Sequence, residues 1–188
     1  MARPRSDEKR SAIMSAAARV IAAQGLGAAT ATIASEAGVS NGSLFTYFDT
    51  KADLLSQLYV ELKTEMGAAA LAGLPGERDL RGQMLHLWRN WLRWAASCPE
   101  KRRALAHLGV SDDIAPEGRA AAHQAMAGVA ALLERSRRNG PLRDAPLAFV
   151  SALMSAMADT TMDFMIADPA NADAHCQTAF EALWRMLA

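Results

Sequence analysis

Alanine dominates this sequence: it fills 41 of the 188 positions, whereas valine fills six and isoleucine five. Alanine is the best helix former, and it is depleted in β-strands, which favour β-branched residues. Hydrophobic residues make up 51% of the chain, which is enough for a sizeable core and excludes a mainly disordered protein. The composition therefore predicts an all-α fold.

Apolar runs and cysteines indicate the compartment. No apolar run approaches the ~20 residues that a membrane-spanning helix needs. The first residues, Met-Ala-Arg-Pro-Arg-Ser, carry charge but precede no apolar segment of a secretory signal. The two cysteines, Cys98 and Cys176, are too few for a disulfide framework. We therefore expect a reduced, cytoplasmic protein without a membrane partner.

Charge is distributed unevenly, although the formal net charge is zero. Residues 1–51 carry six basic and four acidic side chains, a net charge of +2, so residues 52–188 carry −2. The asymmetry is small. It favours the N-terminal part as the region that would meet nucleic-acid phosphates.

Apolar spacing, capping residues and glycine or proline breaks predict nine helices. Gly25 and Gly38 are expected to end helices in the left-handed conformation, Ser40 is expected to cap the short helix at 42–48, and Thr50 is expected to cap a long helix. The expected ranges run from 6 or 7 to 24, then 33–37, 42–48, 51–72, 79–97, 99–110, 116–138 and 146–167, and finally from 171 or 173 to 187.

The segment between residues 30 and 54 carries the strongest functional signal. Two very short helices are joined there by Ala37-Gly-Val-Ser40, and such a pair with a glycine in its turn is typical of the helix-turn-helix. The second helix begins with the small polar residues Asn41, Gly42 and Ser43, which would let its N-terminus enter a DNA major groove closely. A helical hairpin whose glycine and serine serve only as caps is the alternative.

This segment resembles the DNA-binding domain of the tetracycline-repressor (TetR) family of bacterial regulators. The resemblance is carried by Thr32-Ile-Ala34, by Ala37-Gly-Val-Ser-Asn-Gly-Ser-Leu-Phe-Thr-Tyr-Phe48, and by Lys51 and Leu54. It covers about residues 7–62, whereas the remainder resembles the family only in helix number and length. The resemblance implies a recognition helix at residues 41–43 and backbone phosphate contacts before and after it.

The DNA-contacting residues that the resemblance implies are Thr30, Thr32, Ser40, Asn41, Gly42, Ser43, Phe45, Tyr47 and Lys51. Phe45 departs from the family, because many members have tyrosine there. Without the hydroxyl, only an apolar contact remains, for example with a thymine methyl group. Arg3 and Arg5 would form a minor-groove arm if the terminus is ordered on DNA, and a mobile end otherwise.

Other motifs carry no chemistry. Gly25-Leu-Gly27-Ala-Ala-Thr30 partly matches a dinucleotide fingerprint, but it follows a helix and lacks a third glycine. The histidines form no HxxxH pair, and neither a GxSxG nor a Walker sequence occurs. We expect no metal site, no cofactor and no catalytic residue.

Apolar side chains after residue 73 fit either a core or a small-molecule cavity. Three of the four tryptophans lie on the helix predicted at 79–97, and the chain has ten methionines. Aromatic and methionine side chains are an adaptable lining for ligands, although core packing explains the same pattern. The candidate pocket residues are Met84, Trp88, Trp91, Met126, Met154, Met157 and Thr161.

The last two predicted helices are too apolar to be exposed on both faces. The resemblance implies that they dimerise as a four-helix interface, and a two-fold dimer suits a palindromic operator. The candidate interface residues are Phe149, Leu153, Ala156, Phe180, Leu183, Trp184 and Leu187.

Together these features predict a nine-helix regulator with a helix-turn-helix domain at 1–50, a linking helix at 51–72, and a helical ligand-binding and dimerisation domain over 51–188. The expected partners are double-stranded DNA, a second copy of the chain, and a small apolar or amphipathic molecule that releases a repressor from its operator. Two alternatives remain: a DNA-binding regulator without an effector, and an enzyme on a helical scaffold.

Overall fold

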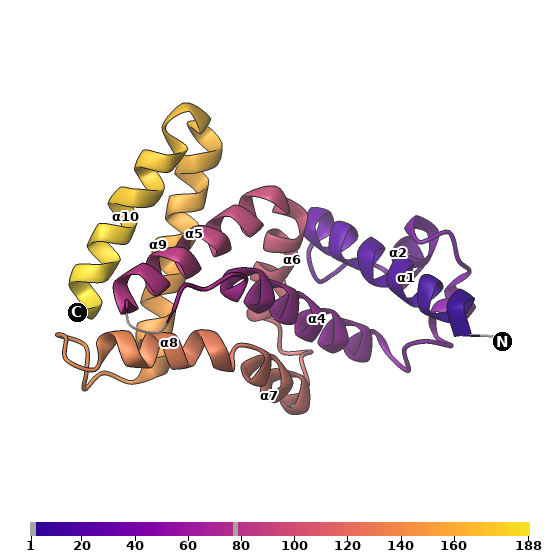
Figure 1. Ribbon diagram of the computed structural model, residues 1–188. Coiled ribbons are helices and arrows are strands. Elements are labelled where there is room, and N and C mark those ends of the chain that lie inside the picture. The colour runs from indigo at the N-terminus through magenta and orange to yellow at the C-terminus, as the bar shows by residue number, and fades with distance from the viewer. Residues whose placement is uncertain (1–2, 77–78) are drawn as a thin grey trace. The chain divides into compact units, whose positions relative to one another are not determined.

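A computed structural model describes residues 3–76 and 79–188, with side chains from residue 7 onward. These residues form the α-helices α1–α10 and the 3-10 helix η1, and they contain no strand, which confirms the all-α prediction (Figure 1). Not one of the described helices combines the length and the hydrophobicity needed to span a membrane. The packing divides into two compact units, residues up to 64 with 98–124 (unit 1) and residues 65–97 with 125–188 (unit 2).

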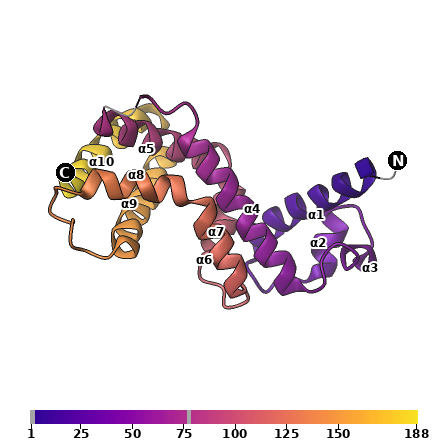
Figure 2. The same cartoon turned by 60° about the horizontal axis from the view of Figure 1, so that its bottom comes forward.

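Unit 1 brings α2 beside α1 and α3 beside α2 (Figure 2). Gly25 and Gly38 have φ values of +73° and +68°, so both predicted left-handed stops are confirmed. The first helix begins earlier than expected, so Arg3 and Arg5, the candidates for a minor-groove arm, lie at its start. The helices of unit 1 are α1 (Arg3–Gln24), α2 (Thr30–Glu36), α3 (Asn41–Leu44), the first part of α4 (Lys51–Leu71), α6 (Pro99–Gly109) and nearly all of α7 (Pro116–Ala125).

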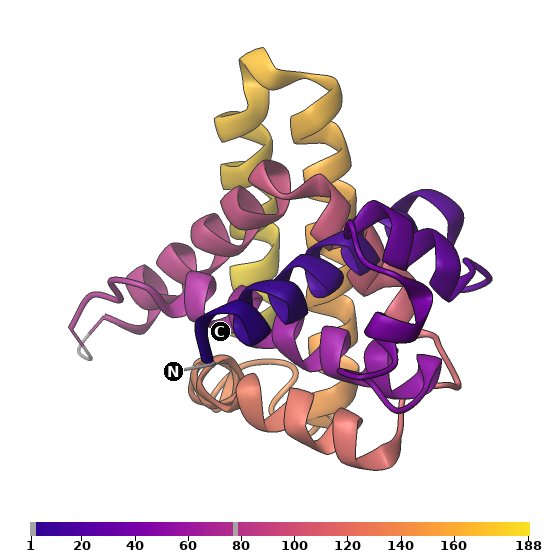
Figure 3. The same ribbon diagram turned by 90° about the vertical axis from the view of Figure 1, so that its right-hand side faces the viewer.

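Unit 2 is built around α5, which packs against α8, α9 and α10, while α9 and α10 run antiparallel as a hairpin (Figure 3). The single helix expected at 116–138 is interrupted, because the backbone at Met126 leaves the helical range with φ −93° and ψ 4°. This interruption accounts for the tenth helix. Unit 2 contains residues 65–71 of α4, α5 (Leu80–Ser97), α8 (Ala127–Arg137), α9 (Leu147–Ala167), η1 (Pro169–Asn171) and α10 (Ala172–Leu187).

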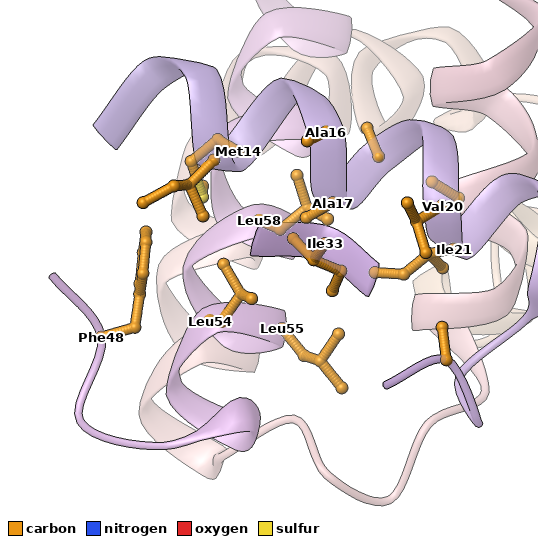
Figure 4. Close-up of a cluster of buried hydrophobic side chains, with 14 of the residues drawn as sticks. Met14, Ala16, Ala17, Val20, Ile21, Ile33, Phe48, Leu54, Leu55 and Leu58 are labelled. Carbon is orange, nitrogen blue, oxygen red and sulfur yellow. The ribbon is translucent and has the colours of Figure 1, made fainter. Parts of the chain in front are cut away.

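The core of unit 1 holds the short helices in place (Figure 4). Along α1, buried apolar residues recur every three or four positions, so they form one stripe. Ile33 of α2, Phe48 after α3 and Leu54 of α4 are each at most 1% exposed in the same cluster. Because α3 is only four residues long, it depends on this tertiary packing more than on its own helix propensity.

Candidate functional site

The turn between α2 and α3 is fixed by backbone hydrogen bonds and one side-chain cap. The amides of Gly38 and Val39 donate to carbonyls of α2, at 3.1 and 2.9 Å. The Ser40 hydroxyl oxygen accepts from the backbone N–H of Ser43 at 3.1 Å, so the predicted cap of α3 is confirmed. The helix is shorter than expected, because Leu44 is its last residue and a turn follows.

The candidate DNA-contacting residues all lie in unit 1, on or beside this turn. Leu44 is fully buried, whereas its neighbours at the start of α3 reach the surface: Asn41 and Gly42 are exposed and Ser43 is half-buried. The buried leucine anchors α3, so its first turn faces solvent. Of the remaining candidates, Thr30, Thr32, Tyr47 and Lys51 are half-buried, and Ser40 and Phe45 are exposed.

The start of α4 is capped by neighbouring side chains. The backbone N–H of Asp53 donates to the Thr50 hydroxyl at 3.0 Å, which confirms the predicted cap. The Asp53 carboxylate accepts in return from the N–H of Asp49 at 3.1 Å, one residue before the position that a standard capping box uses. These bonds set the direction in which the chain leaves the short helices.

A polar network that the sequence alone did not reveal connects α4 with α1. Gln57 donates to Asp53 at 2.9 Å and accepts from the Arg10 guanidinium at 2.8 Å. Arg10 also pairs with Glu61 at 3.5 Å and lies 5.7 Å from the ring centre of Phe48. The spacing of residues 53, 57 and 61 on one helix face was visible in the sequence, but their partner on α1 was not.

Lys51 has a structural partner in the chain. Its Nζ atom donates to the backbone carbonyl of Leu26 at 2.6 Å, which ties the start of α4 to the connection between α1 and α2. The ammonium group has three donors, so this bond leaves capacity for a further acceptor.

The candidate pocket residues of unit 2 separate by burial. Trp88 is fully buried, and its indole N–H donates to the carbonyl of Cys176 at 3.2 Å. Trp91 lies edge-to-face with Trp88, at 6.2 Å between ring centroids, and is half-buried. Met84, Met154 and Thr161 are buried, whereas Met126 and Met157 are half-buried. The Thr161 hydroxyl donates to the backbone carbonyl of Met157 at 2.6 Å.

The candidate interface residues also fall into two groups. Those on α10 mostly fill the core of unit 2: Phe180, Leu183 and Leu187 are 0% exposed. Trp184 is half-buried and stacks on Phe180 at 6.2 Å. On α9, Phe149 is 52% exposed, Ala156 is exposed and Leu153 is half-buried. Phe164, which was not an interface candidate, is 58% exposed.

Shifted pKa values occur near the corner between α9 and α10. Hydrogen bonds from Asn171, at 2.9 Å, and from His175, at 3.2 Å, hold the pKa of Asp168 below its usual value. Burial raises the pKa of the Cys176 thiol, which keeps it protonated near neutral pH. Within residues 3–76 and 79–188, no three His, Cys, Asp or Glu side chains gather as a metal site requires.

The chain is similar to known regulators in sequence and in structure. Residues 13–58 match the family model described as "Bacterial regulatory proteins, tetR family". A protein of Shewanella sp. PV-4 assigned to the tetR family of transcription regulators is 28% identical over 94% of this chain and 96% of its own, with a TM-score of 0.83.

More distant solved structures share the fold. A TetR-family transcription regulator from Marinobacter aquaeolei VT8 has a TM-score of 0.86 at 24% identity, over 99% of this chain and 98% of its own. The regulator FadR from Bacillus subtilis, solved in complex with stearoyl-CoA, has a TM-score of 0.71 at 16% identity, over 95% of this chain and 99% of its own. Residues 13–58 therefore match the tetR family of bacterial regulatory proteins, and the chain has the fold of a tetR-family transcription regulator.

Proposed function

We propose that this protein is a repressor that binds a palindromic operator as a homodimer and leaves it when a small apolar or amphipathic molecule binds. The observation that supports this function best is the contrast along α3. Leu44 is buried and fixes the helix, while Asn41 and Gly42 are exposed at its start. A helix held from behind and free at its N-terminal end is what insertion into a major groove requires.

The proposed contacts divide into phosphate and base contacts. Lys51, Tyr47 and the threonines of α2 would meet phosphates, which fix the register on DNA but carry no sequence information. Asn41 and Ser43 would meet base edges, where asparagine can pair with adenine through two hydrogen bonds. Phe45, 40% exposed and without a hydroxyl, would offer an apolar contact.

Dimerisation would use the exposed side of α9. Phe149 and Phe164 are both more than half exposed, and Ala156 lies between them on the helix. Large apolar side chains exposed along one helix are typical of a surface that a partner covers. A two-fold dimer would present two α3 helices to half-sites about 34–36 Å apart, one turn of DNA.

Effector binding would use the half-buried apolar side chains of unit 2, namely Trp91, Met126 and Met157. The stearoyl-CoA bound by FadR, a distant neighbour in fold, has a long apolar chain, which agrees with an apolar effector. Helix α4 contributes residues to both units, so it is the element through which an effector would act on DNA binding. A differential affinity of about 1–3 kcal/mol would change operator affinity about 5–150-fold.

A gel-shift titration with the duplex upstream of the protein's own coding region tests the DNA contacts. We expect Asn41→Ala to weaken operator binding about 5–150-fold with no effect on a random duplex, because base contacts carry the specificity. Asn139→Ala, at an exposed position between α8 and α9, is the matched control and should bind like the wild type. Equal losses on operator and random DNA would contradict the role of Asn41.

A regulator without an effector is the second candidate function. The full burial of Trp88, Met84 and Met154, at 0–3% exposure, favours it because these side chains then serve only as core. A compound panel that leaves both the melting temperature and the operator affinity unchanged would select this alternative.

A further inference from the structure

One face of α5 carries polar side chains that hold the C-terminal part of α4 and the loop after it. The indole N–H of Trp94 donates to the Glu65 carboxylate at 3.0 Å. The side-chain amide of Asn90 donates to the carbonyl of Ala72 at 3.0 Å, and His86 Nε2 lies 2.7 Å from the same oxygen. Residues 83, 86, 90 and 94 recur at helical spacing, so they share this face.

Gln83 is the most deeply buried of these four, at 4% exposure. Its Nε2 atom donates to the carbonyl of Pro75 at 2.8 Å, while its Oε1 atom has no hydrogen-bond partner among the described residues. The orientation of this amide is not arbitrary. A backbone carbonyl can only accept, so the nitrogen must face Pro75 and the unpaired atom must be the oxygen.

A buried amide oxygen without a donor calls for an explanation, because nearly all buried polar atoms in proteins are paired. Its apolar neighbours on α5, Met84 and Leu87, are both 0% exposed and offer no donor. The same helix carries Trp91, one of the half-buried candidates for effector contact. By its position on the helix, residue 83 therefore stands between the polar residues 86 and 90 of α5 and the apolar residues 84 and 87.

We propose that Gln83 Oε1 is the polar anchor of the effector, and that it accepts a hydrogen bond from a hydroxyl or amide N–H at the end of an apolar body. This inference rests on the proposed effector response. It adds a selection rule for affinity. An uncharged ligand with a hydrogen-bond donor binds more tightly than a carboxylate or an ether of the same size, because these leave the Gln83 oxygen unpaired. Sites built around one buried polar group discriminate in this way.

Binding of two probes of equal size tests the rule. 1-Decanol and 1-methoxynonane have the same number of heavy atoms, and only the alcohol donates a hydrogen bond. Titrations of the full chain, followed by tryptophan fluorescence, should show about a tenfold preference for 1-decanol in the wild type. Gln83→Met should lose this preference and keep the affinity for the ether. Gln124→Met, at an exposed position, should behave like the wild type.

The melting temperature of ligand-free Gln83→Met separates a ligand anchor from a structural role. Gln83→Met removes the unpaired oxygen but also the hydrogen bond to Pro75, and because these two effects on stability oppose each other, the temperature should change by less than about 5 °C. A larger fall would mean that the amide mainly holds Pro75 or a buried water, and it would overturn the inference. So would a preference for the alcohol that survives in Gln83→Met, or one that is missing in the wild type.

Operator binding distinguishes the inference from the function on which it rests. Gln83→Met should bind the operator with wild-type affinity in the absence of probes. If wild-type protein binds the operator but neither probe, the inference fails and DNA recognition stands. If 1-decanol and 1-methoxynonane bind equally and both release DNA, the proposed effector response stands and Gln83 has no part in it.

Discussion

Unit 1 and unit 2 use aromatic residues in contrasting ways. In unit 1, Phe48 is 1% exposed and Phe45, three residues earlier, is 40% exposed, so one serves the core and the other the surface. In unit 2, Trp88 is fully buried while Trp91 is half-buried and in contact with it. In both units, packing between helices decides which ring is buried. Only in unit 1 do local caps and turns also set where short helices begin.

The tryptophan pair should show the largest difference. We expect Trp88→Ala to lower the free energy of unfolding by about 4–5 kcal/mol, because it opens a cavity and removes the hydrogen bond to Cys176. Trp91→Ala should cost about half as much, since its side chain is only half-buried. Urea unfolding followed by circular dichroism measures both. Equal losses in the free energy of unfolding would show that Trp91 belongs to the core, and would remove it from the proposed effector site.

The phenylalanine pair should separate stability from DNA binding. Phe48→Ala should cost about 3–4 kcal/mol, because its fully buried ring fills the cluster between α1 and α4. Phe45→Ala should change the free energy of unfolding by less than about 0.5 kcal/mol, as exposed substitutions usually do. Its operator affinity should nonetheless fall in a gel shift. An unchanged affinity would remove Phe45 from the proposed DNA surface.

The sequence predicted unit 1 well because its signals are local. A glycine with positive φ and a hydroxyl cap act within a few residues, so Gly38 and Ser40 have the predicted conformations. The end of α3 at Leu44 was not predictable in the same way, because no residue near it breaks a helix. The partner of Arg10 was also hidden, since Gln57 lies 47 residues away in sequence.

Unit 2 was predicted in its elements but less completely in the roles of its residues. An apolar stripe predicts that a helix face is buried, but it does not show whether the same chain or a second copy covers that face. Phe180 and Leu183 matched a face for a second copy, yet both lie in the core of their own chain at 0% exposure. Likewise, nothing in the sequence marks Gln83 as buried, because its environment depends on a contact with Pro75, eight residues away.

Lys51 offers the smallest and most informative test, because two roles meet in one side chain. Its ammonium group bonds to the Leu26 carbonyl, and it is also a proposed phosphate contact. We expect Lys51→Met to lower the free energy of unfolding by about 1 kcal/mol, since one half-buried charge-assisted hydrogen bond is lost. Chemical denaturation should detect this loss, and a change below about 0.3 kcal/mol would make the bond to Leu26 irrelevant to stability.

The salt dependence of operator binding then isolates the second role of Lys51. Each phosphate contact that a basic side chain makes adds about 0.9 to the slope of log affinity against log salt concentration. If Lys51 touches phosphate, Lys51→Met should reduce that slope by about one unit on the operator and on random DNA alike. Lys63→Ala removes a positive charge farther along the same helix and should leave the slope unchanged. A variant that loses affinity at an unaltered slope would show that Lys51 only positions α4, and that the phosphate contact belongs to another residue of unit 1.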